Sequence, residues 1–243
     1  MKALVFNGPR DIQYESFPDP SLETDNSVIL KVERCSICGS DLHMYHGENL
    51  GKASYSGGVT PFCVGHEFTG EIVEVGSQVH RFRVGQQVLA SGGAPCGKCK
   101  NCLSGHAQRC AGWTAFGLSG AMNGGQAEFV NVPMADLTLQ PIPEGVTVEQ
   151  SILLTDAMCT AYFGLTRTNL EPGDVVAVVG LGPIGLIGVE LAFTLGASEV
   201  FAIDPVSHRR EHARALGATA LDPSEALRVI MDKTLGAGVP RVF

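Results

Sequence analysis

The sequence predicts a protein of the α/β plus β class, in which a β-rich domain over residues 1–150 precedes an α/β domain over residues 151–243. Two observations support this prediction. Before residue 141, short apolar runs recur between Gly, Pro, Asn and Asp residues, as they do in all-β domains. After residue 145, β-branched apolar runs alternate with stretches that favour helix, as they do in parallel sheets with crossover helices.

The β-rich part contains several short apolar or alternating runs that we interpret as strands. They cover residues 3–6, 28–32, 69–76, 87–90 and 126–132. A tight turn at residues 84–88 leads into the fourth run. This spacing favours an antiparallel, barrel-like β domain over alternating helix and strand.

The α/β part begins with a buried helix predicted over residues 148–165, because apolar residues lie on more than one of its faces. The continuous apolar run 175–180 is typical of a strand buried on both faces. Further elements are helices at 184–195, 207–216 and 224–235, and strands at 200–204, 218–221 and, just beginning, 239–243. This alternation predicts a parallel sheet. A doubly wound domain has six strands, so only part of the sheet is expected here.

Composition narrows the functional classes. The hydrophobic content of 44% and charged content of 17% are ordinary for a globular protein, and the net charge of -8 disfavours nucleic-acid or anionic-membrane partners. The apolar N-terminal run is too short for a signal peptide, and no run reaches the roughly 20 apolar residues of a membrane helix. We therefore expect a cytoplasmic protein, whose eight cysteines bind metal or catalyse rather than form disulfides.

The first chemical motif lies between residues 38 and 67. Cys38, His66 and Glu67 supply a thiolate, an imidazole and a carboxylate, which are the ligand types of zinc. Nearby polar groups suited to proton handling are Ser40, Asp41 and His43. Cys35 and Cys38 also form a C-x-x-C pair, but this pair does not follow the βαβ pattern of redox motifs.

The second motif is a loop with four cysteines: Cys96, Cys99, Cys102 and Cys110. Two intervening residues let neighbouring thiolates reach one tetrahedral ion. Four cysteine ligands predict a closed, structural zinc site. The alternatives are an iron–sulfur cluster, which also uses four thiolates, and unliganded thiols; the cluster lacks support from a proline after the last cysteine.

The third motif, Gly180-Leu181-Gly182-Pro183-Ile184-Gly185, follows a predicted strand and opens a predicted helix. This context makes it a dinucleotide fingerprint. The first glycine permits a tight turn, the second permits close approach of the pyrophosphate, and the third permits helix–strand packing. Free N–H groups at the helix start then face the phosphates.

Asp204 lies 19 residues after Gly185, at the end of the second predicted strand, where a carboxylate would bind ribose hydroxyls. A 2′-phosphate about 4 Å away would be repelled by roughly 4 kcal/mol at an effective dielectric constant of about 20. Asp204 therefore favours NAD over NADP. Arg209 and Arg210 could neutralise a phosphate, although exposed residues of a first helical turn are the simpler interpretation.

The three motifs, in this order, resemble the zinc-containing alcohol dehydrogenase branch of the medium-chain dehydrogenase/reductase family over essentially the whole chain. The resemblance implies a GroES-like β-barrel catalytic domain followed by a partial Rossmann domain, with one catalytic and one structural zinc. It implies hydride transfer between an alcohol or polyol and NAD, with zinc polarising the alcohol oxygen. The implied partners are an alcohol/aldehyde or polyol/ketone pair and, in full-length members, further copies of the chain.

The resemblance also implies particular residue roles. Cys38 and His66 would bind the catalytic zinc, with Glu67 beside it. Asp156 matches the last ligand of the aspartate-using members, and Cys159 is the alternative. Ser40 and His43 resemble a proton relay, and Asp41 resembles the carboxylate that orients a ligand imidazole.

The sequence departs from the family pattern in its length. The predicted sheet is incomplete, and the C-terminal return to the catalytic domain is missing. Two hypotheses follow: part of a zinc- and NAD-dependent dehydrogenase, or a truncated zinc-binding or regulatory relative without catalysis.

Overall fold

A computed structural model of the chain describes residues 1–48 and 60–243. The chain divides into two compact units, Met1–Asp156 and Ala157–Phe243. Among the described residues, no helix has the length and apolar character needed to cross a membrane.

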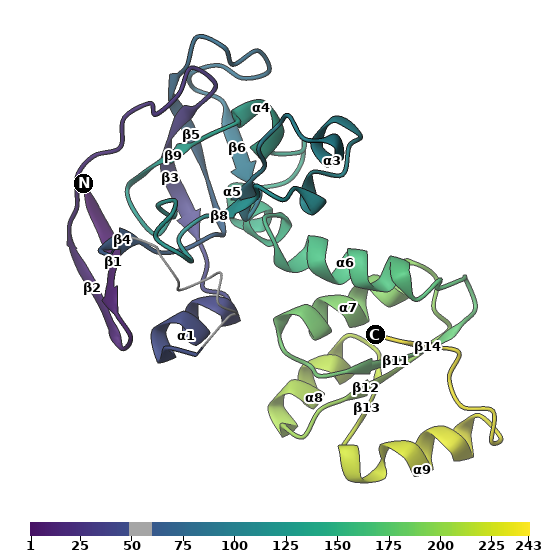
Figure 1. Ribbon diagram of the computed structural model, residues 1–243. Helices are drawn as coiled ribbons and strands as arrows, with labels where there is room; N and C mark the ends of the chain where they lie inside the picture. Colours follow the sequence, from purple (N-terminus) through teal and green to yellow (C-terminus); the bar gives the residue numbers. More distant parts are fainter. Residues whose placement is uncertain (49–59) are drawn as a thin grey trace. The chain divides into compact units, whose positions relative to one another are not determined.

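The first unit is built from antiparallel strands (Figure 1). These strands are β1 Lys2–Gly8, β2 Asp11–Ser16, β3 Val28–Cys35, β4 Phe62–Cys63, β5 Phe68–Val75, β6 Gln87–Ala90, β7 Gly93–Ala94, β8 Thr114–Ala115, β9 Phe129–Val132 and β10 Leu139–Pro141. They form a five-stranded sheet in the order β10-β6-β5-β3-β9, a three-stranded sheet β2-β1-β4, and the pair β7-β8. The segment before β9 connects the two larger sheets, because Gln126 accepts a backbone hydrogen bond from Leu4 and Glu128 accepts one from Val32.

The described helical elements of the first unit are short, and some of them, such as α1 and α3, carry predicted site residues. They are α1 Gly39–His46, α3 Lys100–Leu103, the 3₁₀ turn Ala107–Arg109, α4 Ala135–Thr138, α5 Val148–Ser151 and the 3₁₀ turn Ile152–Leu154. The main core lies on the five-stranded sheet, where the rings of Phe68 and Phe116 pack edge to face with centroids 5.0 Å apart. This core includes Phe68, which follows the predicted ligands His66 and Glu67 directly in the chain.

The second unit is a parallel sheet in the order β13-β12-β11-β14. Its elements are α6 Ala157–Arg167, β11 Val175–Val179, α7 Pro183–Thr194, β12 Glu199–Ile203, α8 Ser207–Ala215, β13 Thr219–Leu221, α9 Pro223–Lys233 and β14 Arg241–Val242. Alternate residues of the central strands face opposite sides. Val176 and Val178 pack with α6, α7 and α8, whereas Ala177 and Phe201 pack with α9 (Figure 1).

The predicted fold class is confirmed: antiparallel β structure is followed by part of a doubly wound parallel sheet. The single buried helix predicted over residues 148–165 is wrong. The structure divides this segment into α5, a 3₁₀ turn and α6, with a break at Thr155 and Asp156. The hydroxyl groups of Ser151 and Thr155 donate to the carbonyls three residues earlier and thereby compete with regular α-helical bonding. The later part is also not fully buried, because Tyr162 and Phe163 are exposed.

Candidate metal centres and cofactor loop

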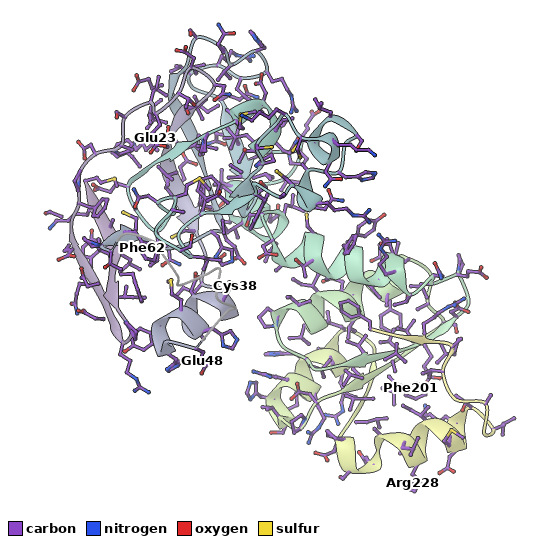
Figure 2. All side chains as sticks on the ribbon, viewed as in Figure 1. Glu23, Cys38, Glu48, Phe62, Phe201 and Arg228 are labelled. Atoms are coloured by element: carbon purple, nitrogen blue, oxygen red, sulfur yellow. The ribbon has the colours of Figure 1, made fainter. Side chains whose placement is uncertain are left out.

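The start of α1 places the first two residues of the candidate catalytic centre. Cys38 is the residue before the helix, and its backbone N–H donates to the Asp41 carboxylate at 2.9 Å. An acidic residue at this position suits the positive end of a helix. Figure 2 labels Cys38 at the start of α1 and Glu48 just beyond its end. Asp41 therefore fixes the backbone that carries the Cys38 thiol.

Four predicted ligands meet in the first unit: Cys38, His66, Glu67 and Asp156. One ligand atom from each lies within 4.8 Å of all the others. His66 Nε2 and Asp156 Oδ2 are 3.5 Å apart, which is long for a hydrogen bond but near the roughly 3.3 Å expected between two atoms that bind one tetrahedral zinc ion. The donor set and its spacing fit zinc.

The other nitrogen of the His66 ring faces Asp41. His66 Nδ1 lies 3.3 Å from Asp41 Oδ1, and neither buried atom has a hydrogen bond of good geometry in the described part of the chain. This arrangement suits a metal ligand, because a carboxylate that accepts from Nδ1–H leaves Nε2 free to bind the ion. Gln126 supports the carboxylate, since its amide nitrogen lies 3.5 Å from Asp41 Oδ2 and donates to the carbonyl of Ser36 at 2.9 Å.

The electrostatics of the cluster favour a cation. Burial by itself lowers the pKa of His66, but the polar groups around the ring, the Asp156 carboxylate first and then that of Asp41, outweigh burial and raise this pKa to about 12. The hydrogen bond to His66 lowers the pKa of the Cys38 thiol against the opposing effect of burial. The site thus stabilises an imidazolium and a thiolate, and zinc binding would release the imidazole proton.

The two predicted relay residues occupy different positions on α1. Ser40 Oγ is 3.5 Å from His66 Nε2, at the edge of the cluster. His43 lies one turn further along, and its Nδ1 pairs with Glu48 Oε2 at 2.5 Å. The structure therefore brings Ser40 to the candidate metal ligands and gives His43 a carboxylate partner that was not predicted.

The four cysteines of the second motif form a separate cluster. The sulfur atoms of Cys96, Cys99, Cys102 and Cys110 all lie within 4.8 Å of one another. Cys102 Sγ is 3.5 Å from Cys99 Sγ and 4.0 Å from Cys96 Sγ, close to the roughly 3.8 Å expected for two thiolates on one tetrahedral zinc. The spacing suits a single ion, since an iron–sulfur cluster binds its cysteines through several irons and holds them further apart.

Backbone N–H groups donate to the sulfur atoms of this second cluster and thereby favour the thiolate form of its cysteines. The N–H of Lys98 is the largest of the influences that lower the pKa of Cys96 to about 6. The N–H of Cys96 donates to Cys110 Sγ at 3.3 Å. Gly97 has a φ of 70°, in the region that favours glycine, and the methyl carbon of Met134 fills the space where its Cβ would lie. The turn between the first two cysteines is thus fixed by packing.

The glycine motif forms the expected strand–turn–helix junction. Gly180 follows β11 with a φ of 91°, and Gly182 precedes α7, with Pro183 and Ile184 in its first turn. A Cβ on Gly185 would lie 1.8 Å from the carbonyl oxygen of Gly180, so only glycine fits there. A Cβ on Gly182 would meet no atom within 4 Å, which leaves open space beside the helix start.

Asp204 lies directly after β12 and is 3% exposed. Its carboxylate accepts hydrogen bonds from the amides of Leu181 and Val206, each at 2.7 Å. Burial raises the pKa of Asp204, but these amides outweigh burial and the pKa is lowered. Asp204 therefore remains ionised and ties the glycine loop to the second strand.

The two arginines that follow differ from each other. Arg209 is 44% exposed, and its guanidinium lies 3.5 Å from the Asp204 carboxylate. Arg210 is largely buried, which corrects the interpretation of both residues as exposed. It donates to the backbone carbonyl of Asp204 at 2.6 Å and pairs with Asp222 at 3.1 Å, so it links the ends of β12 and β13.

Comparison with known proteins agrees with this arrangement. Residues 24–144 match the alcohol dehydrogenase GroES-like domain family. The chain is 40% identical to a probable zinc-binding alcohol dehydrogenase of Mycobacterium tuberculosis, over 100% of this chain and 61% of that protein. It is 36% identical to a medium chain reductase/dehydrogenase of Acremonium sp., over 100% of this chain and 84% of that protein.

The chain belongs to the zinc-containing alcohol dehydrogenase branch of the medium-chain dehydrogenase/reductase family. The resemblance inferred from the sequence is thereby confirmed. Among solved structures, an alcohol dehydrogenase from Thermus sp. ATN1 superposes with a TM-score of 0.91 at 33% identity, over 98% of this chain and 68% of that one. The chain thus spans about three fifths to two thirds of the length of the Mycobacterium and Thermus relatives.

In this member of the zinc alcohol dehydrogenase branch, Asp41, Glu67 and His43 each contact a side chain that was not predicted. Gln126 supports Asp41, Ser36 donates its hydroxyl to the Glu67 carboxylate, and Glu48 pairs with His43. Their own residue types carry no specific signal. The distance along the chain from Gln126 to Asp41 hides that contact, whereas Glu48 lies close enough to His43 for helix-end geometry to have suggested it.

Proposed function

We propose that this chain is the zinc-binding part, and part of the cofactor-binding domain, of an NAD-dependent dehydrogenase that interconverts an alcohol or polyol with its aldehyde or ketone. The observation that carries the proposal is the cluster of Cys38, His66, Glu67 and Asp156. Cys38, His66 and Asp156 would hold the catalytic zinc, with Glu67 as a neighbouring carboxylate. The closed four-cysteine cluster would hold a structural zinc.

The chemistry is divided between the bound groups and the chain. Bound zinc supplies a Lewis acid for the alcohol oxygen, and bound NAD supplies the hydride acceptor. Asp41 keeps His66 in the tautomer that binds metal through Nε2. Ser40, whose Oγ lies 3.5 Å from that nitrogen, would accept the alcohol proton while it gives its own hydroxyl proton to His43, and His43 would pass a proton on to water.

The chain's own residues favour NAD over NADP. Asp204 is ionised at the end of β12, and a 2′-phosphate beside it would be repelled by an order of 4 kcal/mol at about 4 Å and an effective dielectric constant of about 20. Arg209 offsets part of this repulsion, but its charge is already shared with Asp204. Arg210 pairs with Asp222 and therefore does not help Arg209 to offset the repulsion of a 2′-phosphate.

Zinc content and turnover of paired cysteine variants test the proposal. The wild-type chain is expected to bind two zinc ions, one for each cluster. Cys38→Ser should retain one zinc and lower any NAD-dependent oxidation of alcohols and polyols by about a hundredfold or more. Cys35→Ser is the control, because this exposed thiol belongs to neither cluster. A Cys38→Ser variant that keeps both zinc ions would remove this cysteine from the centre, and two zinc ions without turnover would support a non-catalytic protein.

A further inference from the structure

The carboxylate of Glu48 lies directly against the His43 imidazole. The Glu48 Oε2 to His43 Nδ1 distance is 2.5 Å. Because an ionised carboxylate can only accept, the hydrogen must be on Nδ1. The hydrogen bond from His43 also lowers the pKa of Glu48, which therefore stays ionised near neutral pH. Whenever the imidazole is neutral, the remaining ring nitrogen, Nε2, therefore carries the lone pair.

The backbone at the end of α1 holds Glu48 in this position. Gly47 adopts a left-handed conformation with a φ of 74°, and its N–H donates to the carbonyl of Met44 at 3.0 Å. The N–H of Glu48 donates to the carbonyl of His43 at 2.9 Å. These two bonds are the Schellman motif, which turns the chain back over the last helical turn. Glu48 is thereby placed next to His43 by backbone geometry as well as by the side-chain pair.

The same helix end is anchored to the rest of the unit. Met44 is fully buried in a cluster with Phe6 and Phe62. The N–H of Arg10 donates to the carbonyl of Tyr45 at 2.6 Å. The position of the Glu48 carboxylate is therefore supported by contacts to the N-terminal strands and does not depend on α1 alone.

We propose that Glu48 is a positioning residue for His43, which it holds with the hydrogen on Nδ1 so that Nε2 accepts the proton released from the alcohol. The carboxylate then faces the imidazolium as its counter-charge until the proton leaves to water. This inference rests on the proposed function of the site, since it gives His43 its orientation within the relay. His46, which is exposed nearby, is the other titratable group that acts on Glu48.

The His43–Glu48 pair can be substituted with little expected effect on folding. His43 and Glu48 side chains are 53% and 59% exposed, and exposed ion pairs contribute little to folding. Glu48→Ala removes both the acceptor and the charge, whereas Glu48→Gln keeps an acceptor and removes only the charge. Glu23→Gln is a matched control, because Glu23 is an exposed carboxylate at the opposite end of the same unit (Figure 2).

The first test is nitrogen-15 NMR of the His43 ring, assigned with a His43→Gln variant, at a pH where the imidazole is neutral. The wild type and Glu23→Gln should show the Nδ1–H tautomer. Glu48→Ala should shift the ring toward the Nε2–H tautomer that free imidazole favours in water, while Glu48→Gln should retain most of the Nδ1–H form. An unchanged tautomer in Glu48→Ala would overturn the proposal.

The second test is a double-mutant cycle on turnover in the zinc-loaded chain with NAD. Glu48→Ala should lower kcat about tenfold with little change in KM, and should have no further effect when His43→Gln is already present. Independent, multiplying effects would overturn the positioning role. If the tautomer shifts as expected but neither the wild type nor any variant turns over, the positioning of His43 stands and the proposed dehydrogenase function of this chain falls.

Discussion

At the scale of single residues, the buried amide of Gln126 connects the two loops that carry the candidate catalytic ligands. It donates to the Ser36 carbonyl on one loop and approaches the Asp41 carboxylate. Its backbone N–H donates to the carbonyl of Val64, just before the other loop. A Cβ on Gly65 would lie 2.4 Å from Gln126 Cγ, so the two segments are in close contact.

We expect Gln126→Leu to weaken zinc binding at the first cluster by about 10–100-fold, because Asp41 would lose its amide partner and orient His66 less well. The unpaired Ser36 carbonyl should also cost about 1–3 kcal/mol of folding free energy. Competition with a chromophoric chelator measures the affinity of the first cluster for zinc. Gln13→Leu, at an exposed glutamine on β2, is the control, and an equal zinc affinity in both variants would show that Gln126 does not support the centre.

The sequence was enough to predict the candidate metal ligands, which the structure brings together, but not the residues that support them. Cys38 and His66 have side chains that few other functions explain when they occur in such an order with a glycine fingerprint. Gln126 is an ordinary polar residue 85 positions from Asp41. Its role arises only when the segment before β9 joins the three-stranded and five-stranded sheets, and no local pattern records that contact.

At the scale of elements, the segment around residue 156 shows where pattern reasoning fails. Its apolar residues suggested one continuous helix, yet hydroxyl–carbonyl bonds from Ser151 and Thr155 tighten the chain into a 3₁₀ turn. That break places Asp156 with the ligands of the first unit. Helical periodicity measures which faces are apolar, and it contains no information about a competing local hydrogen bond.

A second feature at this scale is the packing of β14 against the helices of the second unit. The ring of Phe243 occupies the space beside Gly164 on α6 and Gly188 on α7. A Cβ on Gly188 would lie 2.4 Å from the Phe243 ring. These two glycines therefore allow the ring to sit between the helices.

We expect Gly188→Ala to destabilise the second unit, although alanine usually stabilises a helix by about 1 kcal/mol relative to glycine. The overpacking against Phe243 should cost about 1–3 kcal/mol. Amide hydrogen exchange in α7 and β11 measures the effect. Phe243→Leu provides the matched background, because the smaller side chain should restore the favourable effect of alanine. Equal destabilisation by Gly188→Ala in both backgrounds would contradict the proposed contact.

At the scale of the whole molecule, the order of motifs predicted the order of the two folds. Each compact unit has its own core, one on the five-stranded antiparallel sheet and one on both faces of the parallel sheet. The parallel direction of the strands in the second unit was predictable, because strands that alternate with helices through right-handed crossovers permit few topologies. The division of the β part into sheets of three, five and two strands was not, because it depends on pairings between segments far apart in the sequence.

These separate cores predict that loss of the structural metal has a local effect. Cys99→Ser removes one of the four sulfur atoms that form the second cluster. The chain should then retain a single zinc, at the first cluster. Metal binding contributes about 10–16 kcal/mol to the folding of small zinc peptides. Among the described residues, Cys110 is the one residue of the loop between β7 and β8 that belongs to the buried hydrophobic core, so the amides of this loop should exchange much faster, while those of β11 and β12 keep their protection.

Amide hydrogen exchange followed along the chain, with zinc content measured on the same samples, distinguishes local from global opening. Cys35→Ser, which alters an exposed thiol outside both clusters, should match the wild type in zinc content and in exchange. The parallel sheet is stabilised by residues of its own unit, such as Val176, Val200 and Phe201, none of which belongs to the zinc loop. If Cys99→Ser accelerated exchange in β11 and β12 as much as in the loop, the two units would unfold as one, and the structural zinc would stabilise the entire chain.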